Sequence, residues 1–182
     1  MNIFYLHNDP AECAKMHVDK HVVKMIIEYA QLLSTAHRIV DGEEYVDKTA
    51  NNRRIKRWRL LDQHDEELFY KASHVNHPSA IWARQSTENY QWLYNLFTCL
   101  CDEYTYRYGK VHKTDTLLRQ KLSQLPTLLR QKMLTEVPQA MPDNCKMPSV
   151  ISAYRNYYIK EKANFAKWTK RQIPEWFKNA NI

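Results

Sequence analysis

Glycine is nearly absent from this chain, with only 2 glycines among 182 residues. Tight turns with positive φ depend on glycine, and an all-β protein needs many of them. The scarcity disfavours a sheet-rich fold and favours long helices. A chain of this length can also bury a hydrophobic core of its own. We therefore predict one all-α domain, residues 1–182, built from five or six helices.

Long hydrophobic runs and patterned cysteines are also missing. No apolar run approaches the roughly 20 residues that cross a bilayer, and the apolar start at residues 2–6 is too short for a secretory signal. The 4 cysteines lack zinc-finger spacing, so we expect reduced thiols in a cytoplasmic protein. We expect no membrane partner and no bound metal.

Positive charge is in excess, with 27 lysines and arginines against 20 acidic residues and a formal net charge of +7. This balance favours partners that carry phosphate. We expect nucleic acid, DNA ahead of RNA, and the sequence leaves the oligomeric state open.

The densest basic run covers residues 51–59, where Trp58 lies among Arg53, Arg54 and Arg57. Basic side chains beside an aromatic ring suit a surface that follows a nucleic-acid backbone and stacks on bases. Acidic residues follow directly, so an amphipathic helix with internal ion pairs is the alternative.

The longest helical pattern covers residues 74–110. His77-Pro78 predicts its start, because proline at the first helical position loses no hydrogen bond. Gly109 predicts its end. Ser86 can cap a second helix within this span, so the pattern fits one long helix or a short helix followed by a long one.

Other segments have weaker patterns. Asp9-Pro10 begins a first helix that we expect to continue without a break until Asp41-Gly42. The remaining expected elements are a short extended segment, the one candidate strand, at Asn2–His7, short helices at Thr114–Gln124 and Leu128–Leu134, a loop at Pro138–Pro148, and a last helix from Ser149 to Pro174.

The first predicted helix has a polar face opposite its core face. Its members recur at steps of three and four residues: His17, His21, Lys24, Glu28, Gln31 and Thr35, with Lys20 beside them. A lysine amine near a carboxylate can open a sugar through a Schiff base. The structural alternative is an ordinary ion pair on a helix. His17 and His21 also have a spacing that can bind zinc, but no third ligand is evident.

Two further groups are candidate contacts to nucleic acid. Asn76 and His77, with Arg84 two turns on, are either helix caps or contacts to a phosphate or base beside the first helix. Basic residues near the end of the chain are expected to hold backbone phosphate. These are Lys167, Lys170 and Arg171, within Lys160–Arg171.

Several segments together resemble known proteins. They are Asn-Ile-Phe-Tyr-Leu at residues 2–6, VDKHVVKM at 18–25, Asn-His-Pro at 76–78, EYTYRYG at 103–109 and Pro-Glu-Trp-Phe at 174–177. Over nearly the whole chain they look like small helical proteins of tailed bacteriophages. Over residues 1–110 the order of motifs resembles, more distantly, the pyrimidine-dimer DNA glycosylases called phage endonuclease V.

The second resemblance implies a compact helical enzyme that kinks DNA, flips out a base and cuts its glycosidic bond, without a metal or diffusible cofactor. In that family the N-terminal α-amine is the nucleophile and a glutamate on the first helix is the acid and base. Here these would be the amine of Met1, or of Asn2 after methionine removal, and Glu28 or, less well, Glu12. Asn2 departs from the family's small second residue, which keeps Lys20 and Lys24 as alternative nucleophiles.

The expected function is that of a DNA glycosylase and lyase acting on damaged or modified pyrimidines, in the cytoplasm of an infected bacterium. The alternatives are an enzyme of phage thymine or uracil modification and a non-catalytic module that binds nucleic acid or a host protein. The candidate catalytic residues are Glu28, Lys24, Lys20, His21 and His77. The candidate binding residues are His17, Asn76, Arg84, Arg53, Arg54, Arg57, Trp58, Lys167, Lys170 and Arg171.

Overall fold

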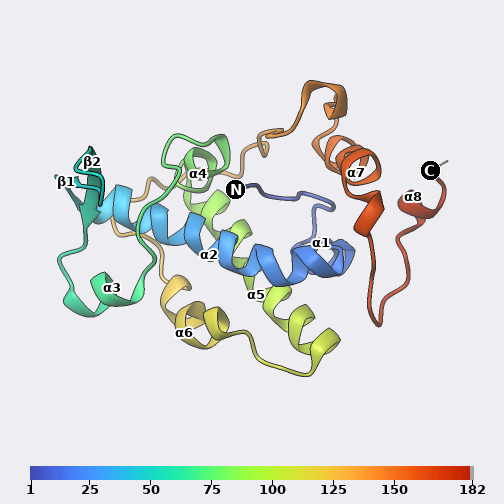
Figure 1. Cartoon of the computed structure of the whole chain (residues 1–182), viewed down its shortest axis with the longest axis horizontal. Helices are drawn as coiled ribbons and strands as arrows, with labels where there is room; N and C mark the ends of the chain where they lie inside the picture. Colours follow the sequence, from blue (N-terminus) through green and yellow to red (C-terminus); the bar gives the residue numbers. More distant parts are fainter. Residues whose placement is uncertain (181–182) are drawn as a thin grey trace.

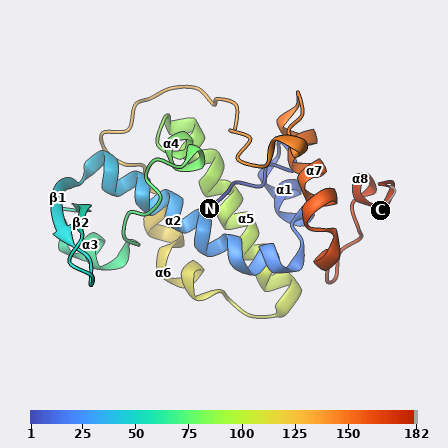
Figure 2. The same cartoon turned by 45° about the horizontal axis from the view of Figure 1, so that its top comes forward.

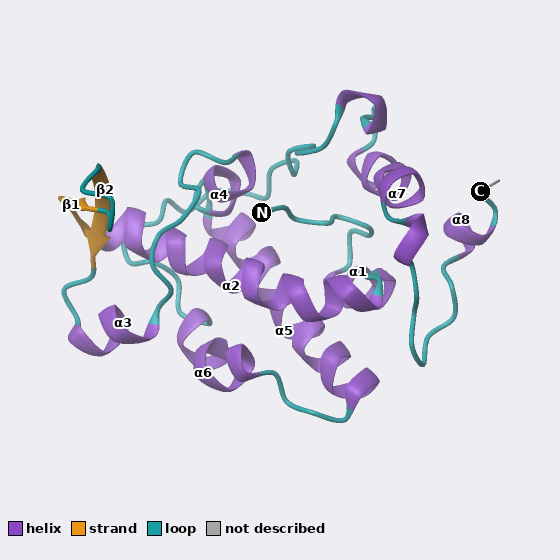
Figure 3. Cartoon of the chain, in the orientation of Figure 1, coloured by secondary structure: helices purple, strands orange, loops and turns teal. Residues whose placement is uncertain are grey.

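The computed structural model describes residues 1–180, and within them eight α-helices account for most of the ordered backbone (Figures 1 and 3). The helices are α1 (Pro10–Met16), α2 (Asp19–Asp41), α3 (Gln63–Leu68), α4 (Pro78–Ala83), α5 (Thr87–Tyr108), α6 (Lys113–Leu122), α7 (Val150–Glu161) and α8 (Glu175–Lys178). Two short 3-10 turns, η1 (Asp143–Cys145) and η2 (Ala163–Phe165), flank α7.

The fold is mostly helical, as predicted, but it is not purely all-α. Strands β1 (Glu43–Lys48) and β2 (Arg54–Arg59) form an antiparallel hairpin where we expected a polar connection and a basic segment or helix. The strand predicted at residues 2–7 is wrong. That segment is extended, but its buried residues bond to side chains instead of pairing with β1 or β2.

Helices α2 and α5 pack along each other at the centre of the molecule (Figure 1). Ser86 caps α5, accepting from the Asn89 N–H, and Gly109 ends it with a φ of 65°. Because α4 ends at Ala83, the alternative of a short helix followed by a long one is confirmed. The hairpin lies at one end of the molecule, and α7 and α8 lie at the other (Figures 1 and 2).

The predicted unbroken first helix is wrong, because α1 ends before His17. His17 has ψ of 134°, outside the helical range, and α2 begins two residues later. The break exposes backbone carbonyls that a continuous helix would have used. The Arg107 guanidinium donates to two of them, the carbonyls of His17 at 2.9 Å and Lys15 at 3.0 Å. A tertiary contact thus satisfies the broken helix end.

Two later predictions also fail for tertiary reasons. Residues 128–134 form no helix, because the chain there runs past the start of α5, where Glu88 accepts from the Leu134 N–H at 2.8 Å. The last helix stops at Glu161 instead of reaching Pro174. Beyond it the chain turns back, and the Trp168 indole donates to the Met16 carbonyl at 2.9 Å. The helix predicted at 114–124 is confirmed as α6.

No helix of the described residues is both long enough and apolar enough to cross a membrane.

A buried ion cluster joins the start of α2 and the segment that follows α7 to helix α5. The Arg107 side chain is fully buried and pairs with Glu103 at 2.6 Å and Asp19 at 2.8 Å. Glu103 also binds Arg171, at 2.8 Å. Burial raises the pKa of Glu103, but hydrogen bonds from Arg171 and Arg107 outweigh it and leave the pKa below 4.5. The cluster therefore contributes stability above that pH.

We expect Arg107→Met to lower the free energy of unfolding by about 3–5 kcal/mol. The change removes one of the two arginine partners of buried Glu103 and the arginine partner of Asp19, and it leaves the Lys15 and His17 carbonyls without this donor. Urea unfolding measures this. The matched control is Arg119→Ala, since Arg119 also pairs with two carboxylates but is 37 % exposed. Its cost should stay within about 1 kcal/mol. Equal losses for the two variants would contradict this account.

Candidate functional site

The N-terminal segment begins beside the middle of α2, where the Met1 α-amine lies, and from there it runs through the core toward α1. Asn2 fixes its start, since its amide donates to the Ala140 carbonyl at 2.8 Å and its Oδ1 lies 2.9 Å from the Tyr154 hydroxyl. The same Oδ1 accepts from the Ile3 N–H at 2.8 Å. One side chain therefore connects the segment to both the 138–148 loop and α7.

Further along, side chains again satisfy the backbone of this segment. The Phe4 N–H donates to the Tyr29 hydroxyl at 3.3 Å, and the Leu6 N–H donates to the Cys13 sulfur at 3.3 Å. Phe4 and Leu6 are buried, so these donors cannot bond to water. The path of the first six residues is thus fixed, and with it the position of the α-amine.

The Met1 α-amine lies 3.8 Å from Glu28 Oε2, and the Met1 side chain is 3 % exposed. Glu28 comes from the middle of α2 and is 13 % exposed. Lys24, one turn earlier, places its Nζ 3.1 Å from Glu28 Oε1 but is 69 % exposed. One carboxylate of low exposure therefore lies near two amines, the Met1 α-amine and the exposed Lys24 amine.

His77 belongs to the same neighbourhood. It caps α4, and its Nδ1 accepts from the Ser79 N–H at 3.2 Å. Burial lowers the pKa of His77, the Met1 ammonium and His74 lower it further, and Glu28 opposes them. In a neutral ring whose Nδ1 accepts, Nε2 carries the proton and can donate. His77 can thus offer a hydrogen bond beside the Met1–Glu28 pair.

The other residues predicted around His77 have simpler surroundings. Asn76 is exposed. Arg84 donates to the Val75 carbonyl at 2.7 Å, closing the loop before α4, and burial lowers the pKa of Arg84. Its Nη1 is buried without a partner among the described residues. The structure thus places Arg84 in a structural role.

His17 and His21 were predicted to share the polar face with Glu28, and this is wrong. His17 is fully buried, with Nδ1 2.8 Å from the Cys13 carbonyl and Nε2 2.8 Å from the Tyr29 hydroxyl. His21 stacks on Phe4 and lies 2.7 Å from the Tyr158 hydroxyl. Both rings belong to the core. Both ring nitrogens of His17 are bonded within the core, which argues against its use as a zinc ligand.

Lys20 is the remaining catalytic candidate. It is exposed, and its Nζ lies 4.7 Å above the Phe165 ring. The structure pairs Lys24, and not Lys20, with Glu28.

The predicted nucleic-acid contacts divide into two groups. Arg53 and Arg54 are exposed on the hairpin, where Arg57 and Trp58 are half-buried. In the second group, Lys167 is exposed, Lys170 donates to the Tyr106 carbonyl at 3.0 Å, and Arg171 binds Glu103. Arg171 is therefore already neutralised inside the protein, and the hairpin is the better candidate for phosphate contacts.

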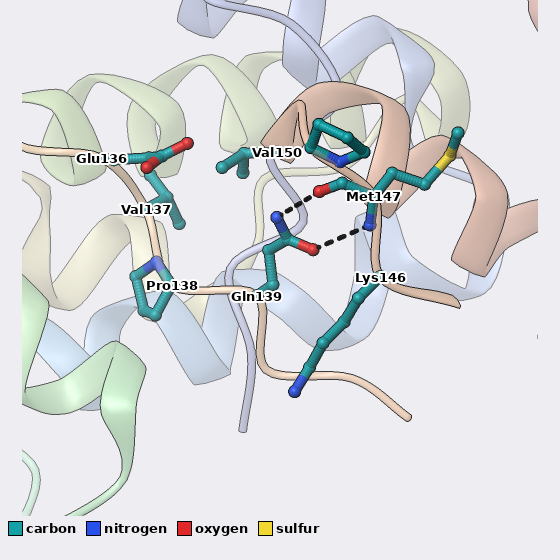
Figure 4. Close-up of a pocket in the computed structure, with 8 residues that line it drawn as sticks. Glu136, Val137, Pro138, Gln139, Lys146, Met147 and Val150 are labelled. Carbon is teal, nitrogen blue, oxygen red and sulfur yellow. Dashed lines mark hydrogen bonds between the residues drawn. The ribbon is translucent and has the colours of Figure 1, made fainter. Parts of the chain in front are cut away.

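Hollows on the described surface lie away from Glu28. One, of about 610 Å³, opens between residues 136–139 and 146–150, where the Gln139 amide group pairs with the Met147 backbone (Figure 4). Another, of about 300 Å³, lies between His37 and Leu128. Glu28, Lys24 and His77 line neither of them.

Glu28 thus pairs with Lys24 and lies 3.8 Å from the Met1 α-amine, and His77 is near enough for the charges of both groups to act on its pKa. The catalytic roles of these residues stay predictions. Sequence reasoning missed the residues that hold the amine there, namely Asn2, Tyr29 and Tyr154. No spacing or motif distinguishes them from ordinary polar and core residues, because their partners are distant in the sequence.

Comparison with protein-family models, curated proteins and solved structures finds no match to this chain.

The buried histidines make stability depend on pH. Burial lowers the pKa of His17 to about 4, of His21 to about 3 and of His37 to about 4, from an ordinary 6.5. Below pH 6.5 these three histidines are therefore protonated in the unfolded chain but stay neutral in the folded chain. Stability should be complete above pH 6.5 and fall as the pH drops toward 4.

We expect His17→Gln to make this decline shallower, even though it also lowers stability at pH 7. The measurement is urea unfolding at several pH values between 7 and about 4.5. His64→Gln is the control, because His64 is 70 % exposed and should leave the slope unchanged. An unchanged slope in His17→Gln would show that His17 is not a buried neutral group.

Proposed function

We propose that this protein is a DNA glycosylase and lyase that acts on a damaged or modified pyrimidine. The observation that carries the proposal is the 3.8 Å approach of the Met1 α-amine to Glu28 Oε2. An amine nucleophile with an adjacent carboxylate is the minimum that such a reaction requires. The resemblance to phage endonuclease V implies the same kinds of group, an N-terminal α-amine and a glutamate on the first helix.

In the proposed reaction the unprotonated Met1 nitrogen attacks C1′ of the target deoxynucleotide. The new C1′–N bond forms as the glycosidic bond breaks, and the base leaves with the bonding electrons and takes up a proton. Opening of the sugar ring then gives a protonated Schiff base. Loss of a C2′ proton expels the 3′ phosphate, which cleaves the strand.

Glu28 has two tasks in this sequence. As a carboxylate it accepts the proton that the amine loses, and as an acid it returns a proton to the ring oxygen as the sugar opens. The fixed N-terminal segment supports this division, because it holds the amine beside the carboxylate before substrate arrives.

Met1 is the proposed nucleophile in preference to Lys24. α-Amines are less basic as a class than lysine amines, so more of the free base is present near neutral pH. Lys24 is 69 % exposed and suits a phosphate contact at the rim of the site. His77, with Nε2 free to donate, suits a contact to the extruded nucleotide.

A non-catalytic nucleic-acid-binding module is the second candidate. The observation in its favour is that Glu28 and His77 line neither of the hollows described above. An enzyme that extrudes a base needs a receptacle for it, formed by protein or by protein and DNA together. Catalysis separates the two candidates, because only the enzyme forms a covalent adduct.

We expect Glu28→Gln to reduce borohydride-trapped adducts at least 100-fold on a panel of duplexes containing a pyrimidine dimer, uracil, hydroxymethyluracil or an abasic site. The glutamine keeps the size of the side chain but cannot exchange the proton. Affinity for the same duplexes should change less than threefold.

Glu12→Gln is the matched control, since Glu12 is the other glutamate suggested by the resemblance and pairs only with Lys15. It should trap like the wild type. Absence of adducts from the wild type on every substrate would leave the non-catalytic binder. Unchanged trapping in Glu28→Gln would refute the role of Glu28.

A further inference from the structure

The hairpin is fixed to the body of the protein by one buried arginine. Arg38, near the end of α2, is 1 % exposed and uses all of its donors. Its guanidinium donates to the carbonyls of Trp58 at 3.0 Å, Tyr70 at 2.8 Å and Phe69 at 2.9 Å. It also donates to the carboxylate and to the backbone carbonyl of Glu66. The base of β2 therefore cannot swing freely.

Gly42 brings the other strand equally close. A Cβ atom at this position would lie 2.4 Å from the Arg38 carbonyl oxygen, so only glycine allows the chain to leave α2 along this path. β1 thus begins, and β2 ends, directly beside the end of α2. Beyond their base they project away from the helices, and every residue of β1 is exposed (Figures 1 and 2).

The two faces of the projecting hairpin differ in charge. Because directly opposed residues share a face, Lys48, Arg54 and Lys56 lie on one face, together with Val46, Trp58 and a single carboxylate, Glu44. The other face balances Arg57 and Arg59 against Glu43 and Asp47. We call the first set of residues the basic face.

The basic face has an unfavourable pairing within it. Lys48 and Arg54 are directly opposed at the end of the ladder, and like charges in that position destabilise a hairpin. Of the three cations, only Lys56 has a carboxylate partner among the described residues, Glu44 at 2.8 Å. Arg53 in the adjoining turn adds another exposed cation. Phosphates that bind beside these cations would reduce the repulsion between them.

We propose that the hairpin inserts its basic face into the major groove of B-form DNA. That groove, about 12 Å wide, admits a two-stranded ribbon, and its phosphate edges match the cations. The major groove of an RNA duplex is too narrow and deep for the same contact. The partner is therefore duplex DNA, held by a ribbon that is already rigid before binding.

The position of this contact relative to the reacting base rests on the proposed function. Gly42 follows Glu28 by roughly 14 residues along α2, a distance of about 21 Å at about 1.5 Å per residue. Duplex DNA rises about 3.4 Å per base pair. For a duplex that lies along α2, the ribbon should therefore meet the DNA roughly 6 base pairs from the target, and on one side only.

The first test compares two double variants that each remove two positive charges. Lys48→Ala with Arg54→Ala should weaken binding to an undamaged 20-base-pair DNA duplex at least tenfold at low salt. The slope of log affinity against log salt should become shallower by about 1.8. Lys110→Ala with Lys113→Ala is the control, because both lysines are exposed and far along the chain from the hairpin.

Three outcomes would overturn the groove contact: an unchanged salt slope, equal losses in the two double variants, or an equal loss on an RNA duplex of the same sequence. Thermal unfolding of each variant shows whether the protein is still folded. This test needs no catalysis, so it can succeed even if the proposed function fails.

The second test uses duplexes with one abasic site and only about four base pairs on one side of it. Wild-type protein should bind at least tenfold more weakly when the short arm lies on the ribbon side, and the Lys48→Ala, Arg54→Ala variant should lose this difference. Equal binding of both orientations by the wild type would overturn the proposed position of the ribbon.

Discussion

The N-terminal segment imposes the constraint on which the rest of the structure depends, because Ile3, Phe4 and Leu6 lie buried with no strand of the described residues beside them. Backbone N–H groups in such a place need partners, and the hydroxyl of Tyr29, the sulfur of Cys13 and the amide oxygen of Asn2 supply them. These bonds fix the path of the segment. Because the path is fixed, the α-amine stays beside Glu28, whereas most chain termini are poorly ordered.

Helix α2 connects this amine site to the hairpin. Its middle carries Glu28, its last turn carries Arg38, and Gly42 directly follows it. The two proposals therefore concern the middle and the C-terminal end of one helix. If both proposals hold, duplex DNA bound at the hairpin would lie at a set distance from the reacting groups, and binding there would determine which nucleotide reaches the amine.

Local signals predicted some features, and tertiary contacts decided the rest. Ser86 and Gly109 act within a few residues of themselves, and both were identified correctly. The spacing of His17 and His21 is the same whether a helix face is exposed or buried. The spacing therefore could not predict that both rings lie in the core. The hairpin was missed because its turn uses Asn52 at a φ of 60° where glycine was the expected signal. The role of Glu28 stays a prediction, which rests on its spacing and on the resemblance together.

The most direct test of the central claim locates the sugar in the borohydride-reduced adduct by tryptic mass spectrometry. If Met1 is the nucleophile, the added mass lies on the peptide of residues 1–15, which ends at Lys15. If Lys24 is the nucleophile, the modified lysine blocks cleavage and the mass lies on a peptide of residues 21–38. The account predicts the first result, and adduct found on residues 21–38 would contradict it.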